Sequence, residues 1–170
     1  MYFNMRVYFL VMSMLLVLSC KKQDGNTVMA LKNETIEVYN FSELETLLYA
    51  DDDRTYVVNF WATWCKPCVE EMPYFQELHD TYAGKNLKVL LVSLDLPADL
   101  DTKLKPFIEK YKLTPQVVLL DDPDENTWIP KVDESWSGAL PATLIYNKNK
   151  RAFYEQSFTK ETLFNEINNF

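Results

Sequence analysis

The strongest constraint on the fold is a strand-like segment that runs directly into two closely spaced cysteines. Residues 56–61 read Tyr-Val-Val-Asn-Phe-Trp, an apolar run rich in β-branched and aromatic side chains, which predicts a buried strand. Residues 64–68 read Trp-Cys-Lys-Pro-Cys, and residues 69–82 then have the composition of a helix. A chain that passes from strand to helix over so short a distance must place both cysteines at this junction.

The two cysteines, Cys65 and Cys68, are spaced to form a redox-active dithiol. With two residues between them they can close into a small disulfide. Free N–H groups and the positive end of the helix dipole favour a thiolate there, and neighbouring Lys66 adds to this effect. Because the thiolate is the reactive form, we expect Cys65 to attack a disulfide and the deeper Cys68 to resolve the mixed disulfide. Pro67 fits the first turn of a helix, where its missing N–H is not needed.

A zinc site and a purely structural disulfide both fit the cysteine pair less well. Half of a zinc site would need further ligands, but the chain has only three cysteines and one histidine, His79. A structural disulfide is poorly motivated, because so small a loop restricts the unfolded chain little. The sequence therefore predicts a catalytic dithiol and no metal site, with His79 on the surface of the helix.

Composition argues against several classes of partner and cofactor. The 170 residues are enough for one domain with its own core. The 17 basic and 25 acidic residues give a net charge of −8, which argues against nucleic acid as a partner. Only three glycines occur, so no glycine-rich loop can cradle the phosphates of a nucleotide. We expect no metal and no organic cofactor.

Residues 1–19 predict a secretory signal of the lipoprotein type. Arg6 precedes the apolar run 7–18, which is too short to span a bilayer as an ordinary helix, and Ser19 precedes Cys20. The end of this run resembles the lipobox of bacterial lipoproteins, in which the cysteine becomes the lipidated first residue of the mature chain. The alternative is an uncleaved membrane anchor with Cys20 as a bystander. Under both interpretations the rest of the chain is exported and tethered to a membrane.

The remainder divides into a tether, residues 20–33, and one domain, residues 34–170. The tether is polar and lacks periodicity, as expected for a flexible link. Within the domain, alternating or continuous apolar patterns predict strands at 35–39, 55–61, 87–94, 116–120, 140–146 and 152–155. Strands that alternate with helices and end in a hairpin predict an α/β sandwich around a mixed sheet.

Helix signals lie between these strands. Ser42 is a candidate N-cap for a short helix, with Glu45 as its capping-box partner. Three further segments are predicted: a helix over 99–112 that is interrupted at Pro106, a loop-like insertion over 121–138, and a last helix capped by Thr159.

Two stretches resemble a known family. Residues 57–68, Val-Val-Asn-Phe-Trp-Ala-Thr-Trp-Cys-Lys-Pro-Cys, continued by Glu-Glu-Met-Pro at 70–73, strongly resemble thioredoxin-like proteins of the TlpA/ResA type. Residues 140–143, Leu-Pro-Ala-Thr, with the strand 144–146 after them, resemble the cis-proline segment of that family. Its members are exported, membrane-tethered bacterial thiol-disulfide oxidoreductases. The resemblance implies a thioredoxin-like three-layer sandwich in which helices flank a mixed central sheet.

The resemblance also implies roles for particular residues. Glu71 takes the place of a buried glutamate that exchanges protons with the thiols, the alternative being a solvated carboxylate on the helix surface. Pro141 in cis would let Leu140 offer main-chain hydrogen bonds to a substrate, the alternative being a trans proline that starts a strand. Asn59 replaces the buried acid of cytosolic thioredoxins, or is simply a satisfied core amide. Trp64 would shield the sulfurs with a flat apolar face.

Three further aromatic residues are candidates for a groove beside the dithiol, namely Tyr74, Trp128 and Trp136. Their rings carry large apolar area, and an indole N–H can be satisfied at the edge of a core. Core packing is therefore the alternative role, and we expect it for at least one of the two tryptophans.

The sequence and the resemblance together predict a lipid-anchored enzyme on the extracytoplasmic side of the bacterial cell envelope. In this interpretation the dithiol reduces disulfides of exported proteins, and a membrane dithiol donor supplies the electrons. Haem-attachment apoproteins, whose paired cysteines must stay reduced, are one substrate class that the family suggests. Two alternatives stay open, an oxidase or isomerase built from the same residues, and a tethered binding module without turnover.

Overall fold

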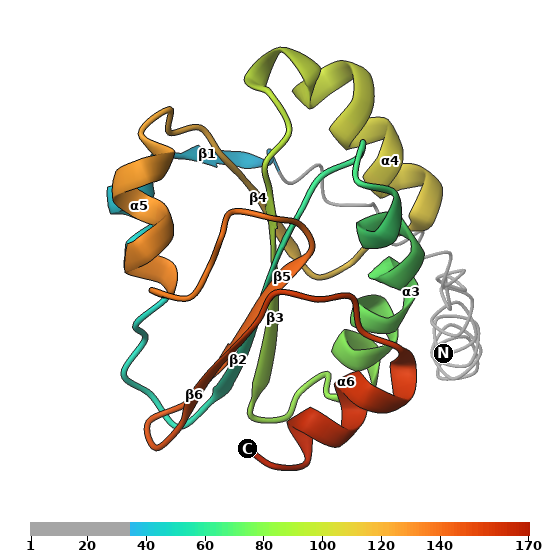
Figure 1. The fold of residues 1–170 in the computed structure, drawn as a ribbon. Helices are drawn as coiled ribbons and strands as arrows, with labels where there is room; N and C mark the ends of the chain where they lie inside the picture. Colours follow the sequence, from blue (N-terminus) through green and yellow to red (C-terminus); the bar gives the residue numbers. More distant parts are fainter. Residues whose placement is uncertain (1–34) are drawn as a thin grey trace, which may run out of the picture. The chain divides into compact units, whose positions relative to one another are not determined.

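A computed structural model describes residues 35–170 of the chain. The centre of the fold is a six-stranded mixed sheet (Figure 1). The strand order is β1-β4-β3-β2-β5-β6. The strands are β1 (Glu37–Tyr39), β2 (Thr55–Trp61), β3 (Leu87–Ser93), β4 (Gln116–Leu120), β5 (Ala142–Tyr146) and β6 (Arg151–Tyr154). The predicted signal at 1–19, the tether at 20–33 and the lipidation site Cys20 lie outside the described residues.

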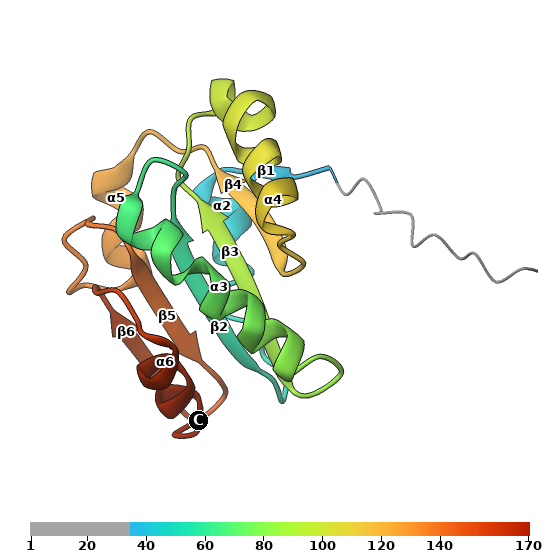
Figure 2. The ribbon, with the colours of Figure 1, turned by 90° about the vertical axis from the view of Figure 1, so that its right-hand side faces the viewer.

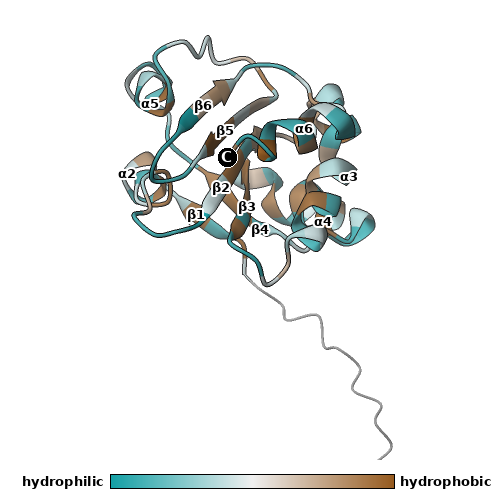
Figure 3. Cartoon of the chain, turned by 90° about the horizontal axis from the view of Figure 1, so that it is seen from below, coloured by the Kyte–Doolittle hydropathy of each residue, from teal (hydrophilic) through white to brown (hydrophobic). Residues whose placement is uncertain are grey.

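Helices cover both faces of the sheet. They are α2 (Phe41–Glu45), α3 (Lys66–Thr81), α4 (Lys105–Tyr111), α5 (Glu125–Val132) and α6 (Lys160–Ile167), with two irregular turns, η1 (Pro97–Asp99) and η2 (Leu100–Leu104), before α4. Helices α3, α4 and α6 lie on one face, and α2 and α5 lie on the other (Figures 1 and 2). Hydrophobic residues concentrate on the strands between these layers (Figure 3). The predicted three-layer α/β sandwich is confirmed. In the described part of the chain, no helix is both long and apolar enough to cross a membrane.

Strand β2 is the strand that organises the site. It runs parallel to β3 and antiparallel to β5, so the start of β5 lies beside the end of β2, where Phe60 is paired with Ala142. Val57 and Trp61 belong to the core beneath α3 and α6, whereas Val58 and Phe60 belong to the core beneath α2 and α5. Because alternate side chains enter two different cores, the strand reads as a continuous apolar run.

The short helix α2 begins earlier than the sequence predicted. Its N-cap is Asn40, whose side chain accepts a hydrogen bond from the Glu43 backbone while Glu43 bonds back to the cap. Ser42 and Glu45 have the same spacing but lie within the helix, so the predicted cap was wrong. The earlier start buries Phe41 and Leu44 together on one face, and this packing decides between two capping boxes of similar quality.

The predicted loop-like insertion at 121–138 contains the helix α5, so that prediction was also wrong. Trp128 and Val132, one turn apart, are both buried by α5. The helix holds Pro130 in its interior, a residue that argues against a helix in any reading of local sequence. Burial of the tryptophan in the core outweighs the weak local preference.

The other elements follow the predictions closely. Strand β1 is an edge strand, β5 and β6 form a hairpin, and Thr159 caps α6. Pro106 lies in the first turn of α4, where the irregular turns before it end. Helix α3 starts at Lys66, a few residues before its predicted start, because Cys65 serves as its N-cap.

Candidate active site

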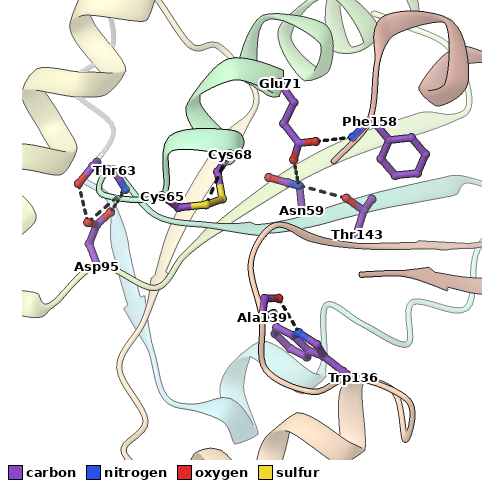
Figure 4. The surroundings of a disulfide bond; sticks show 10 residues. All are labelled: Asn59, Thr63, Cys65, Cys68, Glu71, Asp95, Trp136, Ala139, Thr143 and Phe158. Carbon is purple, nitrogen blue, oxygen red and sulfur yellow. Dashed lines mark hydrogen bonds between the residues drawn. A yellow bond between two sulfur atoms is a disulfide. The ribbon is translucent and has the colours of Figure 1, made fainter. Parts of the chain in front are cut away.

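The two cysteines form a disulfide at the start of α3 (Figure 4). Cys65 caps the helix, and its sulfur accepts a hydrogen bond from the backbone N–H of Cys68 at 3.4 Å. Cys65 keeps 6% of its surface exposed, whereas Cys68 has none. A partner from solvent can therefore reach only Cys65, which is the geometry expected of an attacking and a resolving cysteine.

The two residues between the cysteines help to start the helix, but they do little to stabilise a thiolate. Pro67 lies in the first turn of α3, as predicted. The side chain of Lys66 is 87% exposed, and its Nζ lies 3.8 Å from a carboxylate oxygen of Glu70. An exposed, partly paired ammonium group is strongly screened by water, so Lys66 adds little to the field at the sulfurs.

Asp95, two residues after the end of β3, holds the loop that carries the cysteines. Its carboxylate accepts hydrogen bonds from the Thr63 N–H at 3.0 Å and the Thr63 hydroxyl at 2.6 Å (Figure 4). It also accepts one from the Ser93 hydroxyl at 2.8 Å, and it is buried. Sequence reasoning missed Asp95. The available signal was an acidic residue at the carboxyl end of a parallel strand, the edge where α/β sites assemble.

Glu71 lies inside the protein, three residues after Cys68 on the same face of α3. Only 1% of its surface is exposed, which rules out the alternative of a solvated helix-surface carboxylate. Its Oε2 accepts from the Phe158 N–H at 2.7 Å and its Oε1 from the side-chain amide of Asn59 at 3.1 Å. Burial raises the pKa of Glu71 from 4.5 to about 7, despite these two hydrogen bonds, which lower it. Glu71 can thus gain or lose a proton at neutral pH.

Asn59 joins three elements beneath the dithiol. From β2, its Nδ2 donates both to Glu71 on α3 and to the Thr143 hydroxyl on β5, each at 3.1 Å (Figure 4). Its Oδ1 is buried, and within residues 35–170 no group donates to it. Asn59 therefore both orients the carboxylate and leaves one polar atom unused, which only partly fits the predicted satisfied core amide.

The segment before β5 has the predicted backbone geometry. The Leu140–Pro141 peptide bond is cis, so the trans alternative is wrong. Pro141 is buried, and the half-buried Leu140 packs against the core cluster that contains Cys65 and Cys68. The cis-proline segment and the dithiol thus lie at the same edge of the sheet, where the start of β5 is beside the end of β2.

The expectation that at least one of the two tryptophans packs in the core is confirmed, and the groove role is wrong for both. Trp128 and Trp136 are buried, and their rings pack edge to face, 5.6 Å apart, in the core beneath α2 and α5. Tyr74 is half-buried and packs against the other core, which contains the cysteines. Trp64 instead is 64% exposed, immediately before Cys65, so it is the tryptophan available to a partner.

Two smaller predictions concern His79 and metal binding. His79 lies in the last turn of α3, at the opposite end from the cysteines, and is half-buried. Across residues 35–170, no group of three or more His, Cys, Asp or Glu side chains is arranged to hold a metal ion.

The fold and the site define a thioredoxin-like protein. The structure of a DsbF homologue from Corynebacterium diphtheriae matches with a TM-score of 0.58 at 23% identity, covering 70% of this chain and 73% of that one. A thioredoxin-related protein from Neisseria meningitidis matches with a TM-score of 0.59 at 18% identity, covering 69% and 84%. At these identities the comparison shows the shared fold.

Residues 26–152 match the AhpC/TSA family, and the chain belongs to that family. A thiol-disulfide oxidoreductase ResA from Geobacillus thermodenitrificans is 35% identical over 92 residues, 54% of this chain and 48% of the relative. The ResA of Bacillus anthracis is 41% identical over 105 residues, 62% and 55% of the two chains. The chain thus spans about half the length of the curated relatives it matches.

Proposed function

We propose that this chain is a membrane-tethered thiol-disulfide oxidoreductase that reduces disulfides of exported proteins. The observation that carries the proposal is the Cys65–Cys68 disulfide at the start of α3, with only the first sulfur reachable from solvent. Relatives that match over this region are named thiol-disulfide oxidoreductases, which supports the same chemistry. The cis-proline segment beside the dithiol gives a place where an extended substrate can pair.

The reaction requires two exchanges of sulfur–sulfur bonds. The thiolate of Cys65 attacks a substrate disulfide, a mixed disulfide forms, and the first substrate sulfur leaves as a thiolate. The thiolate of Cys68 then attacks the Cys65 sulfur, which closes the Cys65–Cys68 disulfide and releases the second substrate thiolate. Two electrons pass to the substrate, whose two sulfurs each take up a proton. A membrane dithiol donor returns the pair to the reduced form.

Glu71 supports the second exchange by accepting the proton of Cys68. The two residues share one face of α3, and a carboxylate with a pKa of about 7 accepts a proton at neutral pH without holding it permanently. We expect Glu71→Gln to shift the titration of the thiols in the reduced protein. Unchanged thiol titration would remove Glu71 from the mechanism.

The proposed location and partners depend on the sequence of the leader. The apolar run 7–18 followed by Ser19 and Cys20 supports export and lipid anchoring at the extracytoplasmic face of the bacterial cell envelope. Substrates are then exported proteins with accessible disulfides, and haem-attachment apoproteins are one such class. Palmitate labelling of the full chain in bacteria, compared with Cys20→Ala, tests the anchor directly.

The direction of electron flow is decided by the reduction potential of the Cys65–Cys68 pair. A value at or below roughly −250 mV, near the thioredoxin end of the scale, supports a reductase with a dedicated donor. A value near roughly −120 mV means that the reduced form is favoured and that the protein inserts disulfides, as an oxidase or isomerase would.

Turnover can be separated from simple binding by variants of the two cysteines. Cys68→Ala should trap substrates, because the mixed disulfide on Cys65 is no longer resolved. The double variant Cys65→Ser, Cys68→Ser should be inactive in the cell. If that variant retained full activity, the chain would be a binding module rather than an enzyme.

A further inference from the structure

The segment 136–140, which precedes the cis-proline, is held by a carboxylate from another strand. Glu155, directly after β6, accepts hydrogen bonds from the Ser137 N–H at 3.1 Å and the Ala139 N–H at 3.0 Å. The Ser137 hydroxyl donates to the same carboxylate. These hydrogen bonds, that of the Ser137 hydroxyl foremost, lower the pKa of Glu155, so it stays ionised at neutral pH. One side chain thus fixes two neighbouring backbone groups of the segment.

A second side chain holds the same segment from inside. The indole N–H of Trp136 donates to the Ala139 carbonyl at 2.9 Å (Figure 4). The ring is anchored in the core, with Phe60 at 4.8 Å and Phe153 at 5.6 Å between centroids. Both backbone groups of Ala139 are therefore satisfied by side chains, one at the surface and one in the core.

Leu140, the next residue, has no such partners. Within residues 35–170, no hydrogen bond is made by its backbone N–H or carbonyl, and the pairing of β5 with β2 ends at Ala142. Its side chain packs against the core that contains the cysteines. A fixed backbone with free hydrogen-bonding groups, at the sheet edge that also carries the dithiol, is prepared to pair with an extended chain.

We propose that Glu155 is a positioning residue, which orders the segment 136–140 so that Leu140 presents its backbone to an extended substrate. The proposal rests on the function proposed above. A segment ordered in advance loses less conformational freedom when the substrate binds, so the affinity is higher. Within residues 35–170, the side chain of Glu155 makes hydrogen bonds to Ser137 and Ala139 and none to the cysteines. The chemistry of the dithiol itself should therefore not depend on Glu155.

The test compares a large substrate, which needs the ordered backbone, with a small one, which does not. The full chain and its Glu155→Ala and Glu155→Gln variants reduce insulin with dithiothreitol as the final reductant. In a separate single-turnover measurement, each protein is reduced beforehand, freed of dithiothreitol and mixed with dithiodipyridine, a small aromatic disulfide that dithiothreitol would otherwise reduce directly. For Glu155→Ala we expect KM for insulin to rise about five- to tenfold with kcat changed less than about twofold. The rate with dithiodipyridine and the reduction potential should stay as in the wild type.

The Gln variant should recover part of the loss, because its amide oxygen can still accept one hydrogen bond from the segment. It also carries the test if Glu155→Ala does not fold. Glu134→Gln is the matched control. Glu134 is an exposed glutamate two residues before the same segment, and within residues 35–170 its side chain makes no hydrogen bond. The control should leave both substrates unaffected.

The outcomes separate the two proposals. An unchanged KM for insulin in both variants overturns the role of Glu155 and leaves the proposed function intact. Equal losses with insulin and dithiodipyridine also overturn it, because the damage would then lie at the dithiol. If the wild-type chain fails to reduce insulin at all, the proposed reductase function is overturned, and the role of Glu155, which rests on it, is overturned as well.

Discussion

The buried carboxylate of Glu71 should give the protein a stability that falls as the pH rises towards neutrality. Its pKa is raised from 4.5 to about 7 by burial. Between these values the folded state holds a proton that the unfolded state has released, so unfolding becomes more favourable as pH increases. Each pKa unit corresponds to about 1.4 kcal/mol, so the loss attributable to Glu71 amounts to about 3 kcal/mol.

The variant Glu71→Gln removes this titration and keeps the shape of the side chain. Its NH₂ group must face one of the donors, Phe158 N–H or the Asn59 amide, which costs about 1–3 kcal/mol at every pH. The informative quantity is therefore the pH dependence of the difference between wild type and variant. From about pH 4 to about pH 8, wild type should lose about 3 kcal/mol relative to the variant.

Urea unfolding of the oxidised protein across this pH range measures the difference directly. Glu70→Gln is the matched control, because Glu70 is the exposed neighbour on the same helix and should leave the slope of the wild type unchanged. If the wild-type and Glu71→Gln stability curves run parallel, Glu71 titrates as an ordinary carboxylate, and the argument from burial is wrong.

Three further predictions concern Asp95, the two glycines with positive φ, and Trp64. Asp95→Asn should lower the free energy of unfolding by about 1–3 kcal/mol in urea titrations, because an amide NH₂ would face the Thr63 donors; an unchanged midpoint would contradict this. Gly138→Ala should cost about 1–3 kcal/mol, since Gly138 has φ +93° and a Cβ there would meet a side chain at 3.2 Å. Gly84→Ala, at φ +72° with open surroundings, should cost less, and urea unfolding of the two glycine variants measures this difference; equal costs would contradict the argument from steric contact. Trp64→Ala should change stability by less than about 0.5 kcal/mol while slowing insulin reduction, and equal activity would remove Trp64 from the substrate surface.

The parts of the fold that local pattern could predict are those in which pattern and burial agree. Strand β2 and the start of α3 fall in this class, because the apolar run and the Pro67 signal point the same way. Helix α5 does not, since Pro130 argues against a helix and only tertiary burial of Trp128 explains it. The cap of α2 was missed because two equivalent capping boxes occur two residues apart, and the packing of Phe41 chooses between them.

The site shows the same division. The dithiol was evident from spacing, and Glu71 and Pro141 could be suggested only through the family resemblance. Asp95 and Glu155 act through backbone groups distant in sequence, Glu155 across the β5–β6 hairpin and Asp95 across two parallel strands. Nothing in the residues next to them indicates a partner, so only the fold identifies their roles.

The hydrogen bonds around Glu71 have a consequence for how the protein acquires its chemistry during synthesis. Asn59 reaches Thr143 over a separation of 84 residues, and Phe158 reaches Glu71 over 87. A nascent chain that has emerged only as far as β4 already carries both cysteines, Glu71 and Asn59, yet it lacks Phe158, which donates to Glu71, and Thr143, which accepts from Asn59. The segment that follows β4 therefore completes the surroundings of Glu71, and a prematurely terminated chain would expose the dithiol without them.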